Sequence, residues 1–465
     1  MNLQLSQYKQ FIKNKKVLIW GLGLQGGGIS SAIFFAQNGA RVKVTDLKTE
    51  IQLKKSLDKL SDYNIEYRLG HHDQIDFEWA DVVVVNQDIF NRSSKSSYLD
   101  YLLSKKPNKF ETEMGLFFKL CQAPIIGITG SRGKTTTTIA MGGLLKSTGN
   151  KVFVGGNIPQ SMNLASIEYV NTCDWVVLEL SNYQLHGIDY VQKSPHISVI
   201  TSISADHLVS YDSLDDYVSD KKIIYRYQNH KDYLIIKQDG KYSDIFSNES
   251  HAKTLYFDSL TLPESWQLQI PGQHNRENLS AVYQVGKLLN INERMIKQSL
   301  TNFAGVAYRL ENVATINRIV FVNDTTATTP TAAEIALKSF QNREIIWIGG
   351  GNTKNLPLDK LVETINTQVK KIILLEGLGS DQLLPLLKRK CADFEGRFLG
   401  VFDDFTKAVE CAYKQGSDKD VILLSPGFTS FGMFENEFDR GEQFNQIVDK
   451  LKGTARAEER DDLRK

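Results

Sequence analysis

The sequence has few cysteines and no long apolar run. Its four cysteines, Cys121, Cys173, Cys391 and Cys411, lie far apart, and no two of them form a C-x-x-C pair. This spacing argues against a disulfide framework and against a zinc site, and it favours a reducing environment. No segment approaches the ~18 consecutive apolar residues of a spanning helix, and residues 1–16 lack the apolar centre of a secretory signal. We therefore expect a cytoplasmic protein that does not insert into a membrane.

The chain also lacks an excess of charge of either sign. It has 55 Lys and Arg residues against 54 Asp and Glu residues, so no overall field attracts nucleic acid or an anionic membrane surface. Ligands must then be bound at local sites. The length of 465 residues allows two to four domains with cores of their own. We expect a monomer with no nucleic-acid partner.

What the sequence does contain is a glycine-spaced turn within residues 123–141, APIIGITGSRGKTTTTIAM. The apolar run at 124–128 predicts a buried parallel strand, and the turn leads directly into a predicted helix. Backbone N–H groups of such a turn cradle a polyphosphate, Lys134 can reach its β- and γ-phosphates, and the Thr135 hydroxyl can bind Mg²⁺. Ile128 stands where the P-loop pattern G-x-x-x-x-G-K-[ST] has its first glycine. We interpret the turn as an ATP or GTP site rather than a chance glycine-rich turn.

A second glycine-rich turn, GLGLQG at residues 21–26, lies near the N-terminus. It follows an apolar strand at 16–20 and precedes a predicted helix, a strand at 41–45 and Asp46, which is the order of a dinucleotide fingerprint. Alone, this pattern predicts NAD or FAD. The same turn would, however, hold any nucleotide diphosphate, with Asp46 on its ribose or base. With a buried strand at 80–85, it predicts a Rossmann-like domain over residues 1–110.

Two further alternations of strands and helices follow. Apolar strands at 124–128, 151–156, 174–180 and 196–202 predict a doubly wound sheet within residues 111–308. Strands at 319–322, 344–348, 371–375 and 420–424 predict a second Rossmann-like domain within residues 309–465. The predicted fold class is thus α/β with three domains. An enzyme that closes its domains around ATP and a second nucleotide would account for this organisation.

Acidic residues at strand ends are candidate metal ligands, because ligands bind at the carboxyl ends of parallel strands. Glu179 closes one central strand, and Asp206 and His207 follow the next. Glu179 is either a Mg²⁺ ligand or a hydrogen-bonded or helix-capping acid. His207 taken alone is either a ligand or an ordinary loop residue.

In this order, the motifs resemble those of the Mur ligase family, ATP-dependent amide-forming ligases of peptidoglycan precursor synthesis. The resemblance runs from residue 21 to about residue 451. It rests on GITGSRGKTTT (127–137), GGNI (155–158), LELSNYQL (178–185), DH (206–207), YVSDKKII (217–224), GQHNRENLSA (272–281), YRLE (308–311), NDTTATTP (323–330), GGNTK (350–354) and LSPGFTSFGMFENEFDRGEQF (424–444). The GLGLQG domain and the last motif resemble the branch that adds glutamate to UDP-N-acetylmuramoyl-L-alanine.

This resemblance implies that ATP first converts a substrate carboxylate into an acyl phosphate, which the amine of glutamate then attacks. The family's ATP-binding positions match Gly130, Ser131, Arg132, Gly133, Lys134, Thr135, Thr136, Asn275, Asn278, Arg309 and Asp324. Those expected to hold two Mg²⁺ ions are Thr135, Glu179, His207 and Lys221, the last as a carbamate. The catalytic set is Lys134, His207, Lys221 and Arg309. Without the resemblance, Lys221 would be interpreted as a solvated surface lysine. The alternative role of Arg309 is that of an interdomain salt bridge.

The resemblance also assigns the other two substrates to the first and third predicted domains. UDP-N-acetylmuramoyl-L-alanine is expected at Leu24, Gln25 and Asp46, with Asn157, Ser181 and Gln184 reaching its muramoyl-alanine part. Glutamate is expected at Thr328, Lys354 and Ser430, where Lys354 pairs with a carboxylate.

Several alternatives stay open at this point. Thr326, Gly432 and Phe438 differ from the family pattern around the expected glutamate site, and Tyr308 differs beside Arg309. D-glutamate is therefore the expected substrate, with L-glutamate as the alternative. GLGLQG alone would fit a nicotinamide-dependent oxidoreductase, and the phosphate turn alone would fit a nucleotide-dependent switch protein. A folylpolyglutamate-like or cyanophycin-like ligase is disfavoured by the compact first domain.

Overall fold

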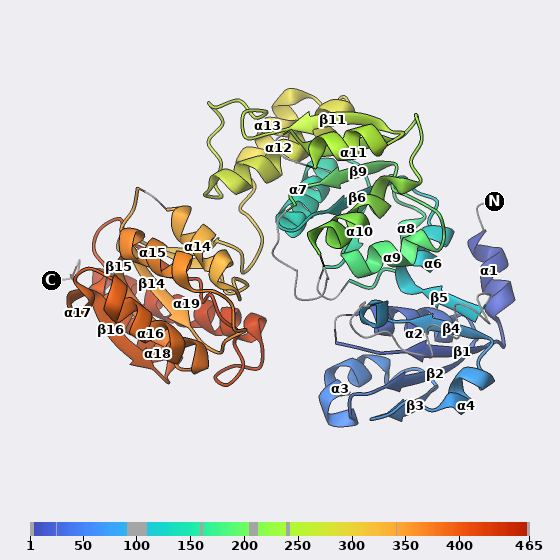
Figure 1. Ribbon diagram of the computed structural model, residues 1–465, viewed down its shortest axis with the longest axis horizontal. Helices are drawn as coiled ribbons and strands as arrows, with labels where there is room; N and C mark the ends of the chain where they lie inside the picture. Colours follow the sequence, from blue (N-terminus) through green and yellow to red (C-terminus); the bar gives the residue numbers. More distant parts are fainter. Residues whose placement is uncertain are drawn as a thin grey trace. The chain divides into compact units, whose positions relative to one another are not determined.

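The computed structural model describes residues 4–24, 26–90, 109–158, 161–203, 213–238, 242–340 and 342–462. The chain forms two compact units, the first from residues 1–266 and 277–300 and the second from residues 267–276 and 301–465. Three sheets occur in the described residues, each combined with helices, which confirms the predicted α/β class (Figure 1). The three sheets follow the three predicted domains, except that the last strand of the first sheet, Phe110–Thr112, crosses the boundary predicted after residue 110, and two of the sheets share the first unit. The division into three domains stays a prediction.

The first sheet is parallel, with the strand order β3-β2-β1-β4-β5. The predicted strands at 16–20, 41–45 and 80–85 are confirmed, whereas β3 and β5 were not predicted. The strands are β1 (Lys16–Trp20), β2 (Arg41–Asp46), β3 (Ile65–Leu69), β4 (Val82–Val85) and β5 (Phe110–Thr112), and the helices are α1 (Leu5–Ile12), α2 (Gly27–Gln37), α3 (Glu50–Leu57) and α4 (Gln74–Trp79). The four valines of β4 are all buried, as expected for a strand covered on both faces.

The second sheet is also parallel, with the order β11-β10-β9-β6-β8-β7. Its strands are β6 (Ile125–Thr129), β7 (Val152–Gly156), β8 (Trp175–Glu179), β9 (Ile197–Ile200), β10 (Tyr233–Lys237) and β11 (Lys253–Phe257). Its helices are α6 (Glu113–Leu120), α7 (Lys134–Ser147), α8 (Ile167–Val170), α9 (Asn182–Asp189), α10 (Leu214–Arg226), α11 (Ser243–Glu249), α12 (Gln273–Leu288) and α13 (Glu293–Thr301). One hydrophobic cluster contains Ile19, Phe117 and Val176, so the two sheets of the first unit share a core.

The third sheet has the order β12-β13-β17-β14-β15-β16, and β12 is antiparallel to β13. Ile345 and Trp347 of β14 belong to one hydrophobic cluster and Ile346 and Ile348 to another, so alternate side chains of this strand fill cores on opposite faces. The strands are β12 (Glu311–Ile316), β13 (Ile319–Asn323), β14 (Ile345–Gly350), β15 (Val369–Leu375), β16 (Phe398–Phe402) and β17 (Val421–Leu424). The helices are α14 (Pro330–Lys338), α15 (Asp359–Gln368), α16 (Leu378–Lys390), α17 (Phe394–Arg397), α18 (Phe405–Gln415) and α19 (Glu437–Asp462). Among all helices of the described residues, none combines the length and apolarity needed to span a membrane.

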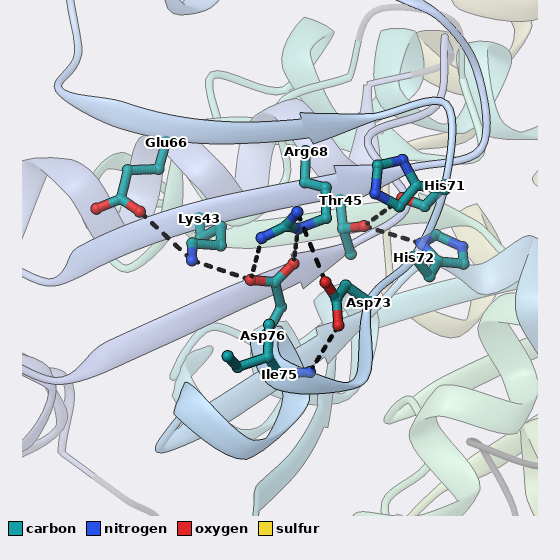
Figure 2. Close-up of polar contacts among 9 residues, drawn as sticks. All are labelled: Lys43, Thr45, Glu66, Arg68, His71, His72, Asp73, Ile75 and Asp76. Atoms are coloured by element: carbon teal, nitrogen blue, oxygen red, sulfur yellow. Dashed lines mark hydrogen bonds and ion pairs between the residues drawn. The ribbon is translucent and has the colours of Figure 1, made fainter.

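A buried carboxylate ties helix α4 to the first sheet. Figure 2 shows Asp76, whose side chain is fully buried, between Lys43 of β2 and Arg68 of β3. Lys43 Nζ donates to Asp76 Oδ1 at 2.9 Å, and Arg68 Nε donates to Asp76 Oδ2. Burial alone would raise the pKa of Asp76, but the hydrogen bonds from Arg68 and Lys43 outweigh it and hold the pKa below its usual value. Asp76 is therefore an ionised anchor at neutral pH.

We expect Asp76→Asn to lower the free energy of unfolding of the first unit by about 1–3 kcal/mol, because two charge-assisted hydrogen bonds lose their charged acceptor. The matched control is Glu66→Gln, which removes an exposed carboxylate 3.4 Å from Lys43 and should cost about 0.5 kcal/mol or less. The lowered pKa means that the contribution of Asp76 is complete above the unfolded value of about 3.9 and is lost as the pH falls through the folded value. Urea unfolding should thus show a lower free energy of unfolding for Asp76→Asn than for the wild type at pH 7, and this difference should shrink in acid. Equal losses of unfolding free energy in the two variants would contradict the stabilising role of Asp76.

Candidate active site

The turn that the sequence predicts to bind phosphate connects the end of β6 to the first residue of α7. Gly130 has φ +145° and Gly133 has φ +82°, conformations that L side chains rarely adopt. A Cβ on Gly130 would lie 2.1 Å from Thr201 Oγ1, and a Cβ on Gly133 would lie 2.1 Å from Asn278 Oδ1. Both positions therefore require glycine. The short distance from Gly133 also shows that Asn278, a predicted ATP residue, lies directly against the turn.

Hydrogen bonds from the segment after β9 fix this turn. The backbone N–H of Ser131 donates to Ser202 O at 2.7 Å, and that of Arg132 donates to Ser202 Oγ at 3.1 Å. Lys134 Nζ donates to the carbonyls of Gly130 and Ser131, at 2.9 and 3.1 Å. The ammonium group thus lies over the turn, at the positive N-terminus of α7, where an anion is stabilised. The next two predicted residues, Thr135 and Thr136, occupy the first turn of the same helix.

Lys221 lies in α10 and is 2% exposed, so its interpretation as a surface lysine is wrong. Its Nζ donates to Thr129 Oγ1 at 3.1 Å and lies 5.1 Å from the ring of Tyr217, whose hydroxyl is 3.0 Å from Ser131 Oγ. Burial and the nearby Lys134 hold the pKa of Lys221 well below its usual value, against the opposing effects of Asp220 and Glu179. A lysine with a lowered pKa carries a larger fraction of neutral amine, which is its nucleophilic form.

Glu179 ends β8, next to β6 in the sheet, and is 3% exposed. Its Oε1 accepts a hydrogen bond from Asn157 Nδ2 at 3.1 Å, while its Oε2 is buried and has no partner among the described residues. Ser181, not Glu179, caps the following helix α9. A buried carboxylate oxygen without a donor is costly unless a cation or water satisfies it, so Glu179 fits the role of a metal ligand.

The other predicted metal ligands differ in how far the structure describes them. In the part of the chain that the structure describes, no three His, Cys, Asp or Glu side chains cluster as a metal site. The predicted ligands Thr135, Glu179 and Lys221 lie among the described residues, and their roles in holding Mg²⁺ stay predictions. The predictions for Asp206 and His207 lie outside the described residues.

A pocket lies at the GLGLQG turn of the first sheet. The described residues 21–24 and 26–28 line it together with Asn86, Gln87, Tyr183 and Gln184. Leu24 belongs to this lining, and Gln25 lies outside the described residues. Asp46 is buried behind the turn, where its Oδ2 accepts from Gly23 N at 3.0 Å and its Oδ1 from Lys48 N at 2.9 Å. Ser181 and Gln184 form the capping box at the start of α9. The roles of these residues in nucleotide binding stay predictions.

Glu113 also lines this pocket, and no sequence motif marked it. Its Oε1 is buried without a partner among the described residues. Burial raises the pKa of Glu113 to about 7, although hydrogen bonds involving Ser30, Leu164 and Asn163 oppose the shift. In the sequence it is simply an acid in the first turn of a helix, which is a common arrangement.

In the second unit, the three residues predicted to bind glutamate lie on loops that follow neighbouring strands β13, β14 and β17. Lys354 Nζ donates to Thr328 Oγ1 at 3.1 Å. The loops after β14 and β17 are joined by paired backbone hydrogen bonds between Asn352 and Thr429, at 2.9 and 3.1 Å, and Ser430 follows directly and is 4% exposed. Burial lowers the pKa of Lys354, while Glu437 opposes the shift. The structure therefore brings Thr328 and Lys354 together at the carboxyl edge of the sheet.

Of the remaining predicted ATP residues in this unit, Arg309 and Asp324 lie at an unusual turn. Arg309 is exposed and stands between Tyr308 and Leu310, which both have positive φ, +65° and +46°. Asp324 accepts from Leu310 N at 3.2 Å and from Ser425 Oγ at 2.7 Å, so it holds this turn against the sheet. Asn275 Nδ2 donates to Pro271 O at 2.7 Å.

Comparisons with known proteins agree with this arrangement. The model of the Mur ligase middle domain matches residues 128–262, and that of the Mur ligase glutamate ligase domain matches residues 308–428. A UDP-N-acetylmuramoylalanine–D-glutamate ligase from Roseiflexus sp. is 34% identical over 94% of this chain and 99% of its own length. The chain belongs to the Mur ligase family. The protein of the same name from Acetivibrio thermocellus is 33% identical to this Mur ligase over 97% of this chain and 100% of its own.

Solved structures show the same fold at lower identity. UDP-N-acetylmuramate-alanine ligase MurC from Thermotoga maritima has a TM-score of 0.59 and 18% identity, over 94% of this chain and 100% of its own. Family membership makes this Mur ligase an ATP-dependent, amide-forming enzyme. Membership of this family excludes the two alternative interpretations, a nicotinamide-dependent oxidoreductase and a nucleotide-dependent switch protein.

We expect Gly133→Ala to abolish ATP binding, because a Cβ would meet Asn278 Oδ1 and the left-handed backbone would be strained. The matched control is Gly143→Ala, further along α7, where an added Cβ meets no atom within 4 Å. That variant should bind ATP like the wild type and gain about 1 kcal/mol of helix stability. Isothermal titration with ATP and magnesium measures the ATP affinity of both variants. Normal ATP binding by Gly133→Ala would contradict the steric requirement for glycine.

Proposed function

We propose that this Mur ligase joins D-glutamate to UDP-N-acetylmuramoyl-L-alanine, with conversion of ATP to ADP and phosphate, in peptidoglycan precursor synthesis. The observation that carries the proposal is the identity of 33–34% to ligases of that name over at least 94% of this chain. The positions of the phosphate turn, Lys221 and the Thr328–Lys354 pair support it. They supply, in one chain, groups for a polyphosphate and for an amino-acid carboxylate.

The reaction needs two steps, because a carboxylate is a poor acyl donor. An oxygen of the alanyl carboxylate attacks the γ-phosphorus of ATP and ADP leaves, which gives an acyl phosphate. The amine of glutamate then attacks the acyl carbon, phosphate leaves, and the nitrogen loses a proton. In the first step two anions must approach each other, so Lys134, at the N-terminus of α7, would serve to neutralise and align the phosphates. Arg309 is a further proposed ATP-binding residue, as its motif implies.

For the amino acid, Lys354 supplies a positive charge and Thr328 and Ser430 supply hydroxyl groups. Lys354 pairs with one carboxylate as a point charge, and the hydroxyls complete the hydrogen bonds of the carboxylates. Binding at fixed points would orient the amine toward the acyl carbon, which is the main contribution that a protein can make to such a step.

We also propose two Mg²⁺ ions, held by Thr135 and Glu179 and by His207 and Lys221 as a carbamate. Bound Mg²⁺ would screen the negative charges of the phosphates and the attacking carboxylate. The unpartnered Oε2 of Glu179 supports its assignment. The lowered pKa of Lys221 supports carbamate formation, because the neutral amine is the form that adds to CO₂.

The deciding experiment supplies purified protein, ATP, magnesium and UDP-N-acetylmuramoyl-L-alanine with either D- or L-glutamate. We expect phosphate release with D-glutamate and not with L-glutamate, and we expect hydroxylamine to trap the activated acyl group. Lys134→Ala serves as the inactive control, because it removes the charge over the phosphate turn. Release with L-glutamate alone would reverse the assignment of the isomer, and no trappable acyl group under any condition would reject the mechanism.

A second prediction concerns Lys221. Lys221→Ala should abolish turnover, and short carboxylic acids such as acetate should restore part of it by standing in for the carbamate. The control is Lys222→Ala, since the neighbouring Lys222 pairs with Glu249 at 2.7 Å and should tolerate the change. Steady-state rates with and without added acid measure the effect. A folded Lys221→Ala protein that no acid restores would count against the carbamate.

A further inference from the structure

A fully buried arginine lies beneath the loops that carry the predicted glutamate residues. Arg440, in the first turn of α19, is 0% exposed. Its Nε donates to Thr325 Oγ1 and its Nη2 to Thr325 O, both at 2.9 Å, and Nη2 also approaches Phe428 O at 3.5 Å. Its guanidinium carbon lies 5.9 Å from the ring centre of Phe434. One side chain thus contacts the loop after β13 and the loop after β17.

These two loops carry Thr328 and Ser430. Thr325 is three residues before Thr328, and Phe428 is two residues before Ser430. Gly427 N in the second loop donates to Ala327 O in the first at 2.8 Å. Thr325 Oγ1 in turn donates to Glu437 O at 2.8 Å, and Asn323 Nδ2 donates to Gly441 O at 2.9 Å. The start of α19 is therefore joined to the loop after β13 on both sides of Arg440.

Arg440 is costly to keep in this position. No ion pair of its guanidinium occurs among the described residues, and its Nη1 is buried without a hydrogen-bond partner there. A buried cation that lacks a counter-ion costs several kcal/mol, and an apolar side chain of similar size would often be as stable. Burial lowers the pKa of Arg440 to about 10, with Glu437 opposing the shift, so the side chain keeps its charge at neutral pH. Fold stability alone does not account for a charged fork here.

We propose that Arg440 is a positioning residue of the amino-acid site, which fixes the loops bearing Thr328 and Ser430 and places a positive charge beneath them. The inference rests on the proposed binding of glutamate at these loops. This arrangement would strengthen the binding of a negatively charged amino acid in two ways. Its hydrogen-bond partners are held in place, and the positive charge of Arg440 favours its carboxylates.

The test compares Arg440→Met, which removes the charge and both bonds to Thr325, with Arg440→Lys, which keeps the charge but loses the fork. We expect Arg440→Met to raise the KM for glutamate about tenfold or more, while the KM values for ATP and for the nucleotide substrate change by about twofold or less. Arg440→Lys should lie between wild type and Arg440→Met.

The matched control is Val448→Ala, which truncates a buried side chain in the hydrophobic core on the same helix. It should lower the melting temperature and leave all three KM values unchanged, which separates loss of stability from loss of positioning. If Arg440→Met does not fold, Thr325→Val provides the test, because it removes the acceptor of Arg440 Nε at nearly constant volume. It should raise the KM for glutamate in the same selective way.

An unchanged glutamate KM in a folded variant, or equal increases in all three KM values, would overturn the inference. A wild-type protein that releases no phosphate with any amino acid would instead refute the proposed function, so the two failures are distinguishable.

Discussion

The close packing at the end of β6 is the constraint on which the first unit's chemistry depends. Because Gly130 and Gly133 have no Cβ, the turn between them lies directly against Thr201 and Asn278, which come from segments far apart in the sequence. The neighbouring strand β8 ends at Glu179, and Lys221 reaches the last residue of β6 from α10. A phosphate turn, a carboxylate and a buried amine are thus assembled by the adjacency of parallel strand ends, which is where α/β sheets bind ligands.

Both units keep charged or polar groups where stability alone would not favour them. Glu179 has a buried oxygen without a partner, Lys221 is a buried amine beside another cation, and Arg440 is a buried guanidinium without an ion pair among the described residues. Asp76 makes a useful contrast, because its buried charge is matched by two cations and needs no ligand to explain it. Local conflicts with the rules of stable packing are expected where a protein must bind and react.

The sequence predicted the elements whose signal is local. The strands at 16–20 and 319–322 are mainly apolar runs, and the phosphate turn is marked by glycines that its backbone requires. Edge strands such as β3, IEYRL, include charged residues and give no such signal. The burial of Lys221, Glu113 and Arg440 could not be predicted from spacing, because it depends on which helix packs over which strand end. Lys221 lies in a motif that implies its role, Arg440 lies in the motif at 424–444 without an expected role, and Glu113 lies in none of the motifs.

Three of the positions that differ from the family pattern lie together in the structure. Thr326 Oγ1 donates to Tyr308 O at 2.8 Å, and the ring of Phe438 packs edge-on against Tyr308 at 6.0 Å. Tyr308 OH in turn donates to Glu442 at 3.0 Å. Two of the differing residues, Thr326 and Phe438, therefore contact a third, Tyr308, in the turn that presents Arg309, whereas Lys354 bonds Thr328 in a separate contact. These contacts involve the turn that presents Arg309 and not the Thr328–Lys354 pair, so they give no ground for expecting a change of amino acid at that pair.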